Sequence, residues 1–472
     1  MGNNKFTLFS LFSGAGGIDL GFLLSGSFNI LFANDALPSP VKTYAYNFHH
    51  KIVDVNEIAS LRFDFPVCVL GDVSNIDFSK IRSEGVDVVI GGPPCQDFSI
   101  VRGPEKERQG LSFKRGRLYV HFVRALVHLN PKVFVFENVP GLKSANRGIA
   151  YKTIIEDFVK LNLRWEEVRK IAGNGTSKNA KNYLIIFSGI VDSAHLGVPQ
   201  RRKRLIIIGA RGDLFGKDWV VLSAVKQKVE NILLGRKCIF RKYPLTPLEV
   251  FEGKPLHELD NEYREIMEEY KDVADSVKTE RALVWRKEWE KLSFDAVTDY
   301  LKLNEIVPKS KGEMEEAFSE HAEVLKKLGY LGIRLEGRYF PDKSNDLPEG
   351  SESVLARLRM IPPGENHLFV KGTEWEVEGR GMSLIYRRLH PLKPSYTVVA
   401  YGGGGTWGYH YRRCRGRLTN RERARLQTFP DWFLFKGSAS EVRAQIGEAV
   451  PPLLGQKIAE AVEVILRWGE LT

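Results

Sequence analysis

The sequence predicts a doubly wound α/β fold, with a smaller domain of mixed structure attached to it. Four apolar runs rich in β-branched residues have the composition of buried parallel strands, and helix-like segments such as 118–129 lie between them. These runs are VDVVI at 86–90, KVFVF at 132–136, NYLIIF at 182–187 and RLIIIG at 204–209. Strands that alternate with helices favour a sheet covered on both faces, whose ligands bind at the carboxyl ends of the strands.

Glycines and carboxylates follow the first strand-like segments. Gly14-Ala15-Gly16-Gly17 comes directly after FSLFS, and such a turn lets the backbone approach a ligand or a helix closely. Asp35 and Asp72 follow two later segments, where carboxylates can accept hydrogen bonds from ribose hydroxyls and an adenine amino group. The turn does not fit the dinucleotide fingerprint, because the position that requires its last glycine is Asp19. The pattern indicates a nucleoside-containing cofactor without a pyrophosphate; a plain tight turn is the alternative.

Two reactive side chains follow the next two strands. Pro93-Pro94 stiffens the exit of strand 86–90 immediately before Cys95, and a thiol at the end of a strand can be activated as a thiolate. Glu137 follows strand 132–136, where partial burial would raise its pKa and suit it to donate a proton. The alternatives are a small buried cysteine and a carboxylate that caps a turn.

The chain divides into three parts. We expect a first domain over 1–215, a second over 216–440 that contains a charged, solvated helical insertion at about 249–330, and a C-terminal segment over 441–472. The last segment contains GQKIAEAVEVILRW, an amphipathic helix that we expect to return to the N-terminal sheet.

Charge and cysteine content limit the possible functions. Residues 249–330 contain 13 Lys and Arg against 21 Asp and Glu, so the rest of a chain of net charge +11 carries +19. A basic body favours a polyanionic partner, although an ordinary basic protein is the alternative. The four cysteines never form C-x-x-C, so we expect neither a metal nor a disulfide framework. We see no secretory signal and no membrane span, and we expect a cytoplasmic protein.

Several motifs together resemble those of a known family. FSGAGGIDLGF, GGPPCQDFS, FENVPG, VPQRRKRLIIIG and GEAVPP occur in this order and closely resemble the motif set of the C5-cytosine DNA methyltransferases. The resemblance covers residues 7–215 and about 385–465. It implies a Rossmann-like S-adenosylmethionine-dependent catalytic domain over 1–215 and a target-recognition domain over 216–440.

The resemblance implies a binding site for S-adenosylmethionine. Phe12 would stack on adenine, Asp35 would bind the ribose, and Asp72 with Val73 would bind the adenine edge. The other residues implied in cofactor binding are Gly14, Gly16, Gly17, Pro94, Leu118 and Glu448. The family usually has Asn at the position of Glu448, so this chain places a carboxylate near the methionine end.

The resemblance also implies how the reaction proceeds on a cytosine flipped out of the duplex. Cys95 would attack C6, Glu137 would hold or protonate N3, and Arg204 would contact O2. Arg202 would orient Cys95 and neighbouring groups. C5 would then take the methyl group before Cys95 is eliminated.

The implied partner is double-stranded DNA. Its predicted contacts are Ser99, Arg102, Gln200, Thr397, Arg412 and Arg413. We expect a monomer on DNA in a prokaryotic restriction-modification system, associated with the nucleoid and possessing a separate cognate endonuclease. The role of the acidic insertion stays open between a part of the recognition domain, a dimer contact and a spacer.

Three other functions are less well supported. The tRNA-acting branch of the family carries a Cys-Phe-Thr signature that this sequence lacks. A catalytically silent DNA-binding homologue would have no chemical need for Cys95, Glu137 and Arg204 together. A nicotinamide oxidoreductase would explain neither Pro-Pro-Cys nor Glu-Asn-Val.

Overall fold

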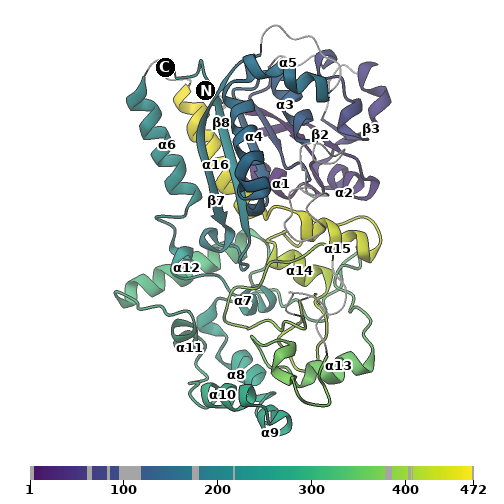
Figure 1. The fold of residues 1–472 in the computed structure, drawn as a ribbon. Helices are drawn as coiled ribbons and strands as arrows, with labels where there is room; N and C mark the ends of the chain where they lie inside the picture. The colour runs from purple at the N-terminus through teal and green to yellow at the C-terminus, as the bar shows by residue number, and fades with distance from the viewer. Residues whose placement is uncertain are drawn as a thin grey trace. The chain divides into compact units, whose positions relative to one another are not determined.

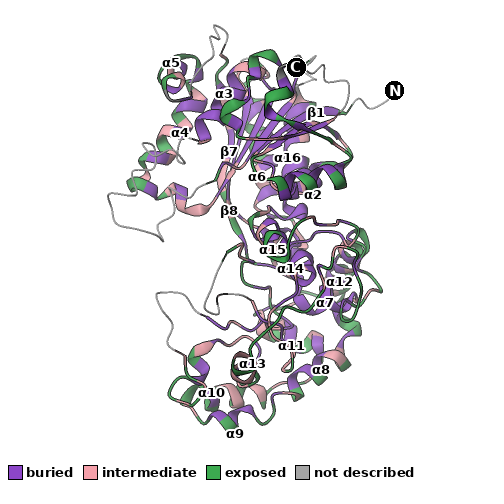
Figure 2. Cartoon of the chain, turned by 90° about the vertical axis from the view of Figure 1, so that its right-hand side faces the viewer, coloured by how far each residue is buried: buried purple, intermediate pink, exposed green. Residues whose placement is uncertain are grey.

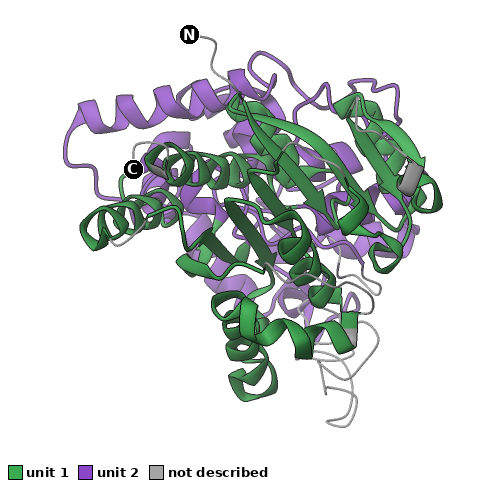
Figure 3. Ribbon diagram, turned by 90° about the horizontal axis from the view of Figure 1, so that it is seen from above, with its two compact units in different colours: residues 1–192, 203–237, 450–472 green, residues 193–202, 238–449 purple. Residues whose placement is uncertain are grey.

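A computed structural model gives the fold of the chain. The structure describes residues 5–60, 66–81, 85–94, 118–172, 180–215, 218–377, 385–401, 406 and 408–469. The chain forms two compact units (Figures 1 and 3). Unit 1 comprises Met1–Asp192, Lys203–Lys237 and Val450–Thr472, and unit 2 comprises Ser193–Arg202 and Cys238–Ala449. The described part of the chain contains no helix that is both long and apolar enough to cross a membrane.

Unit 1 is built on an eight-stranded sheet with the order β3-β4-β2-β1-β5-β6-β8-β7. Its strands are β1 (Phe6–Leu11), β2 (Phe28–Asp35), β3 (Lys51–Asp54), β4 (Val67–Leu70), β5 (Val88–Gly91), β6 (Val133–Asn138), β7 (Tyr183–Asp192) and β8 (Lys203–Arg211). Its helices are α1 (Gly17–Ser25), α2 (Pro38–Phe48), α3 (Leu118–Leu129), α4 (Ile149–Val159), α5 (Leu161–Ala172), α6 (Trp219–Leu233) and α16 (Pro452–Gly469). The predicted helix at 118–129 is confirmed. The strands are largely buried, whereas the helices expose one face (Figure 2).

The direction of one strand, β8, differs from the prediction. The runs at 182–187 and 204–209 were expected to be parallel, but β8 is antiparallel to both β6 and β7. Only residues 193–202 separate β7 from β8 in the chain, and parallel neighbours need a longer crossover connection that usually contains a helix. The other adjacent strands of the sheet are parallel, so the predicted mixed α/β class, with a mostly parallel sheet, is confirmed.

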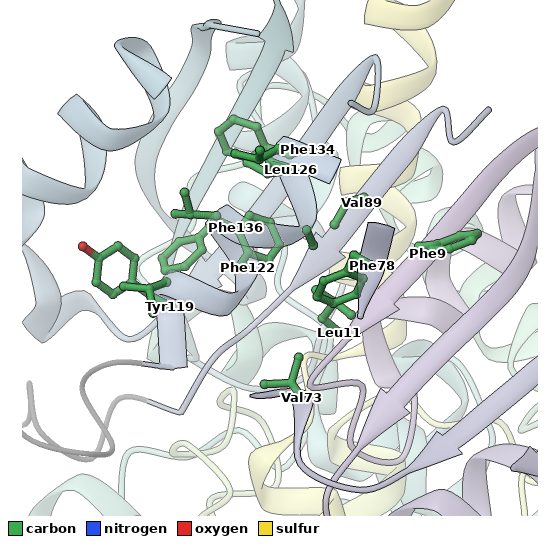
Figure 4. Close-up of a cluster of buried hydrophobic side chains, with 14 of the residues drawn as sticks. Phe9, Leu11, Val73, Phe78, Val89, Tyr119, Phe122, Leu126, Phe134 and Phe136 are labelled. Carbon is green, nitrogen blue, oxygen red and sulfur yellow. The ribbon is translucent and has the colours of Figure 1, made fainter. Parts of the chain in front are cut away.

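Aromatic rings fill the core beneath the sheet. Phe122 of α3 meets the rings of Phe134 and Phe136 at steep angles, with centroids 6.0 and 5.5 Å apart (Figure 4). It also meets the ring of Phe158, at 6.1 Å. Such edge-to-face pairs add to the free energy of burying the rings. This packing fixes α3 against β5 and β6, and therefore fixes the ends of both strands.

The C-terminal helix α16 packs against α1 within unit 1. The two helices cross at Gly21 and Gly455, where the backbones come unusually close. A Cβ atom on Gly21 would lie 2.3 Å from the backbone nitrogen of Gln456, so no larger residue fits without movement of a helix. Because α1 begins at the glycine turn, α16 also supports that turn from behind.

Unit 2 consists of α-helices joined by long irregular segments. It contains α7 (Pro247–Glu252), α8 (Asp260–Glu268), α9 (Val273–Val277), α10 (Glu280–Trp289), α11 (Ala296–Leu303), α12 (Lys311–Lys327), α13 (Glu352–Arg359), α14 (Asn420–Leu426) and α15 (Ala439–Glu448). The acidic segment 249–330 is helical as expected, but it is more than a solvated insertion. Tyr263, Ile266 and Tyr270, for example, are fully buried, so this segment supplies part of the interior of unit 2.

A buried ion pair joins α7 to α12. The Nδ1 atom of His321 lies 2.8 Å from the Glu249 carboxylate, and its Nε2 atom lies 2.9 Å from the Tyr243 carbonyl oxygen. Glu249 also accepts from the backbone N–H groups of Thr246 and Leu256, as an ionised carboxylate does. Both ring nitrogens therefore donate. Burial opposes the charge, but the Glu249 carboxylate raises the pKa of His321 overall.

Candidate active site

The carboxyl ends of the central strands of unit 1 lie level with one another. Leu11 pairs with Asn34 of β2 on one side and with Gly91 of β5 on the other, and Gly91 pairs in turn with Phe136 of β6. The chain turns in opposite directions from β1, toward β2 and toward β5. In an open α/β sheet, this switch point is where ligands bind.

The glycine turn occupies the end of β1. Phe12 and Gly14 both have a φ of 55°, in the left-handed region, and Gly16 follows at 87°. A Cβ on Gly16 would lie 2.5 Å from the ring of Phe48, whereas a Cβ on Gly14 would meet nothing within 4 Å among the described residues. Gly16 is therefore required for packing. Gly14 presents its backbone to open space, as a ligand cradle does.

Two carboxylates border this turn. The oxygens of Asp35 accept from the backbone N–H of Gly14 and from that of Leu37, both at 2.9 Å. Burial raises the pKa of Asp35, and these two N–H groups oppose the rise. Asp72 lies at the exposed start of a short 3-10 turn, Val73–Asn75, where its side chain accepts from the Ser74 N–H at 2.8 Å. Each carboxylate oxygen retains the capacity to accept a further hydrogen bond from a ligand.

Glu137 and Arg204 form an ion pair next to the end of β5. The Nε atom of Arg204 lies 2.9 Å from Oε1 of Glu137, and their side chains are only 14% and 15% exposed. A Cβ on Gly92 would lie 2.7 Å from Oε2 of Glu137, so the glycine is needed for this close approach. Burial lowers the pKa of Arg204, and the Glu137 carboxylate opposes that shift. The pair therefore holds a carboxylate at a strand end in one orientation.

The segment that leads toward Cys95 is tied to the same strand end. The amide of Asn138 donates to the Pro93 carbonyl oxygen at 3.2 Å. Exposed Pro94 follows, and half-buried Leu118 begins α3. Three predicted site residues, Cys95, Ser99 and Arg102, lie outside the described residues.

Gln200 and Arg202 belong to unit 2, where both are buried among backbone carbonyls. Arg202 donates to Val398 O at 3.0 Å and to Gly447 O at 2.7 Å. The Gln200 amide accepts from the Val398 N–H and donates to the side chain of Gln427. These bonds join the segment before β8 to the region around 398 and to the end of α15. Gln200 and Arg202 therefore hold backbone segments in place.

The remaining predicted DNA-contacting residues also have partners inside unit 2. Thr397 donates to the Arg201 carbonyl oxygen at 2.8 Å. Arg412 donates to Glu269 at 2.9 Å and is 14% exposed, and Arg413 donates to Asp272 at 2.5 Å. The acidic helices thus supply counter-charges to the two arginines that we expected to contact phosphate.

Glu448, which we expected near the cofactor, ends α15 in unit 2 with its side chain exposed. The structure therefore groups Phe12, Gly14, Gly16, Gly17, Asp35, Asp72, Val73, Pro94, Leu118, Glu137 and Arg204 in unit 1. Gln200, Arg202, Thr397, Arg412, Arg413 and Glu448 belong to unit 2.

Two residues near the site carried no prediction. Asp19 is fully buried in the first turn of α1 and accepts from the Tyr44 hydroxyl at 2.9 Å, and burial raises its pKa to about 6. Arg124 of α3 donates to the Val73 carbonyl oxygen at 2.7 Å. A sequence signal existed for both, since a charged residue within an apolar helical stretch needs a buried partner.

Comparison with known proteins agrees with this geometry. The profile of a family described as C-5 cytosine-specific DNA methylase matches residues 6–463. The DNA (cytosine-5-)-methyltransferase M.ApeKI of Aeropyrum pernix is 52% identical, over 98% of this chain and 99% of its own. The type II methyltransferase M.NgoFVII of Neisseria gonorrhoeae is 32% identical, over 98% and 87%.

A solved structure shows a similar fold. It is described as a DNA modification methyltransferase encoded within an E. coli prophage, and it matches with a TM-score of 0.52 and 21% identity over 98% of this chain and all of its own. The profile match covers nearly the whole chain and the identity to M.ApeKI is high, so the expected family resemblance is confirmed. The chain belongs to the C-5 cytosine-specific DNA methylase family.

Proposed function

We propose that this chain methylates C5 of cytosine in a specific sequence of duplex DNA, with Cys95 as the nucleophile and Glu137 as the proton-holding group. The observation that carries the proposal is the partly buried Glu137–Arg204 pair at the end of β6, 2.9 Å apart, beside Gly92. Gly92 lies three residues before Cys95 and follows β5, the strand next to β6. A carboxylate fixed beside Gly92 suits chemistry on a planar base.

The residues of unit 1 fit S-adenosylmethionine. The open space at Gly14, the half-buried ring of Phe12 and the exposed carboxylate of Asp72 offer a backbone cradle, a stacking surface and an acceptor for an amino group. Asp35 supports the cradle through the Gly14 N–H and would bind the ribose. The cofactor supplies the methyl group when bound.

The protein groups divide the chemistry on the base. The Cys95 thiolate adds to C6, and Glu137 holds a proton at N3 so that the electron pair displaced from the C5–C6 double bond does not leave an anionic ring. Arg204 keeps the Glu137 carboxylate in place and is the group expected to contact O2. After C5 has accepted the methyl group, loss of the C5 proton and departure of Cys95 restore the double bond. One proton is released for each methyl group transferred.

Unit 2 supplies target recognition. Gln200 and Arg202 organise the backbone around 398, the region in which we expect contacts to DNA. Type II methyltransferases among the relatives support a role in restriction-modification. We propose that the enzyme acts as a monomer beside a separate cognate endonuclease, in the cytoplasm of a prokaryote and in association with the nucleoid.

The experiment is transfer of labelled methyl groups from S-adenosylmethionine to mixed-sequence duplex DNA, followed by bisulfite sequencing. Wild type is compared with Cys95→Ala and with Cys414→Ser, which changes an exposed cysteine of unit 2. We expect label at C5 of cytosine for wild type and the control, and none for C95A. Label on tRNA instead of DNA, or undiminished transfer by C95A, would contradict the proposal.

A further inference from the structure

Arg124 of α3 is a buried cation that the proposed reaction does not use. Its side chain is 5% exposed, and its two terminal nitrogens donate to consecutive backbone carbonyls. Nη2 lies 2.7 Å from Val73 O, and Nη1 lies 3.2 Å from Ser74 O. Its guanidinium also lies 5.2 Å from the centre of the Phe78 ring. A planar fork with five donors suits this bidentate geometry, and a lysine does not reproduce it.

The two carbonyls belong to the turn that carries Asp72. Within this turn, the Asp72 side chain accepts from the Ser74 N–H, and the Asn75 N–H donates to the Asp72 carbonyl oxygen. These bonds are local and shape the turn without attaching it to another element. Arg124 attaches it to α3, and the same helix packs into the core through Phe122 (Figure 4).

The two histidines beside Arg124 on α3 have lowered pKa values, so Arg124 carries the positive charge on this face of the helix. His121 and His128 lie on the same face of α3, since they are three positions before and four positions after Arg124. Burial and the charge of Arg124 lower the pKa of His121 to about 4, and they also lower the pKa of His128. Asp72 and Asp77, on the turns opposite, provide the negative charge that faces Arg124.

We propose that Arg124 is a positioning residue for the adenine of the methyl donor: it touches no ligand atom, but it holds the Asp72–Val73 turn at the distance from α3 at which the turn selects a 6-amino purine. This inference rests on the proposed function, which assigns the adenine edge to Asp72 and Val73. It adds that adenine selectivity depends on a side chain in a different element.

The test measures binding of two probes by calorimetry: S-adenosyl-L-homocysteine, and S-inosyl-L-homocysteine, which has an oxygen in place of the amino group. The variant is Arg124→Met. The matched control is Arg211→Met. Arg211 donates at 2.6 Å to the carbonyl oxygen of Asn130, which directly follows the C-terminal end of α3. Arg124→Lys keeps the charge but loses the fork, and it replaces R124M in the measurement if R124M does not fold.

We expect R124M to raise the Kd of S-adenosyl-L-homocysteine about tenfold, as loss of a well-placed hydrogen bond would. The preference of the wild type for the adenine probe should also disappear. R211M should retain that preference, and kcat of R124M at saturating cofactor should change less than its KM. In a double-mutant cycle, Asp72→Ala combined with R124M should bind no more weakly than D72A alone, because both variants remove the same contact.

Three results would overturn the inference. These are an unchanged preference in R124M and R124K, equal loss in R124M and R211M, and losses of R124M and D72A that add. If wild type bound S-adenosyl-L-homocysteine normally in these cases, the proposed function would stand and only the role of Arg124 would fail. If wild type bound neither probe, both would fall.

Discussion

Glu137→Gln tests the ion pair on which the proposed chemistry depends. The substitution keeps the volume of the side chain but leaves the Arg204 guanidinium, 14% exposed, without its carboxylate partner. Two unit charges about 4 Å apart at an effective dielectric constant of about 20 attract by roughly 4 kcal/mol. Removing one member of a buried pair typically costs about 3–5 kcal/mol. We expect the free energy of unfolding of unit 1 to fall by about 3 kcal/mol, and kcat to fall at least about 100-fold because the N3 proton is no longer held.

The assay is urea unfolding followed by circular dichroism, for E137Q, Arg204→Met and the double variant. If the two groups stabilise each other, the double variant is no less stable than E137Q, since removing the unpaired cation also removes its burial cost. Glu230→Gln is the control, because its pair with Arg236 is 43% and 46% exposed and should contribute less than about 1 kcal/mol. Additive losses for E137Q and R204M would refute the reasoning, as would a loss for E230Q equal to that for E137Q.

Three further predictions concern other contacts. Gly16→Ala should lower stability because its methyl group would overlap aromatic rings. Gly14→Ala should cost only about 1–2 kcal/mol of backbone strain but should weaken cofactor binding, because its methyl group would occupy the open space of the cradle; thermal melts and calorimetry distinguish the two variants. The pKa of His121 is about 4 when folded and about 6.5 in an unfolded chain, so unfolding takes up protons between these values. The contribution of His121 to the free energy of unfolding should be fully present above pH 6.5 and be lost as the pH drops toward 4. In urea titrations, His121→Asn should make the free energy of unfolding depend less on pH over this range; an unchanged dependence would contradict the prediction. Arg412→Met should destabilise unit 2 by removing the bond to Glu269, yet leave the salt dependence of DNA binding unchanged; a slope reduced by about 1 would instead show a phosphate contact.

Strand ends were the most predictable part of the fold. The apolar run at 132–136 and the polar residues after it placed Glu137 at a strand end, because a buried parallel strand requires a continuous apolar sequence. The same composition cannot encode strand direction, so β7 and β8 were expected to be parallel. Tertiary contacts could not be predicted either, because the sequence around Gly21 and Gly455 does not indicate that the two helices cross at these glycines.

Composition overstates the number of unpaired positive side chains that could bind DNA phosphates. The sequence separates an acidic segment from a basic one, which suggested that the arginines at 412–413 were free to meet phosphate. In the folded unit 2 these segments face each other, and Glu269 and Asp272 pair with both arginines. At Arg412, which is 14% exposed, a phosphate would have to displace the Glu269 carboxylate, and this yields less free energy than binding an unpaired cation. The acidic helices therefore reduce the unpaired positive charge that Arg412 and Arg413 can offer to a phosphate.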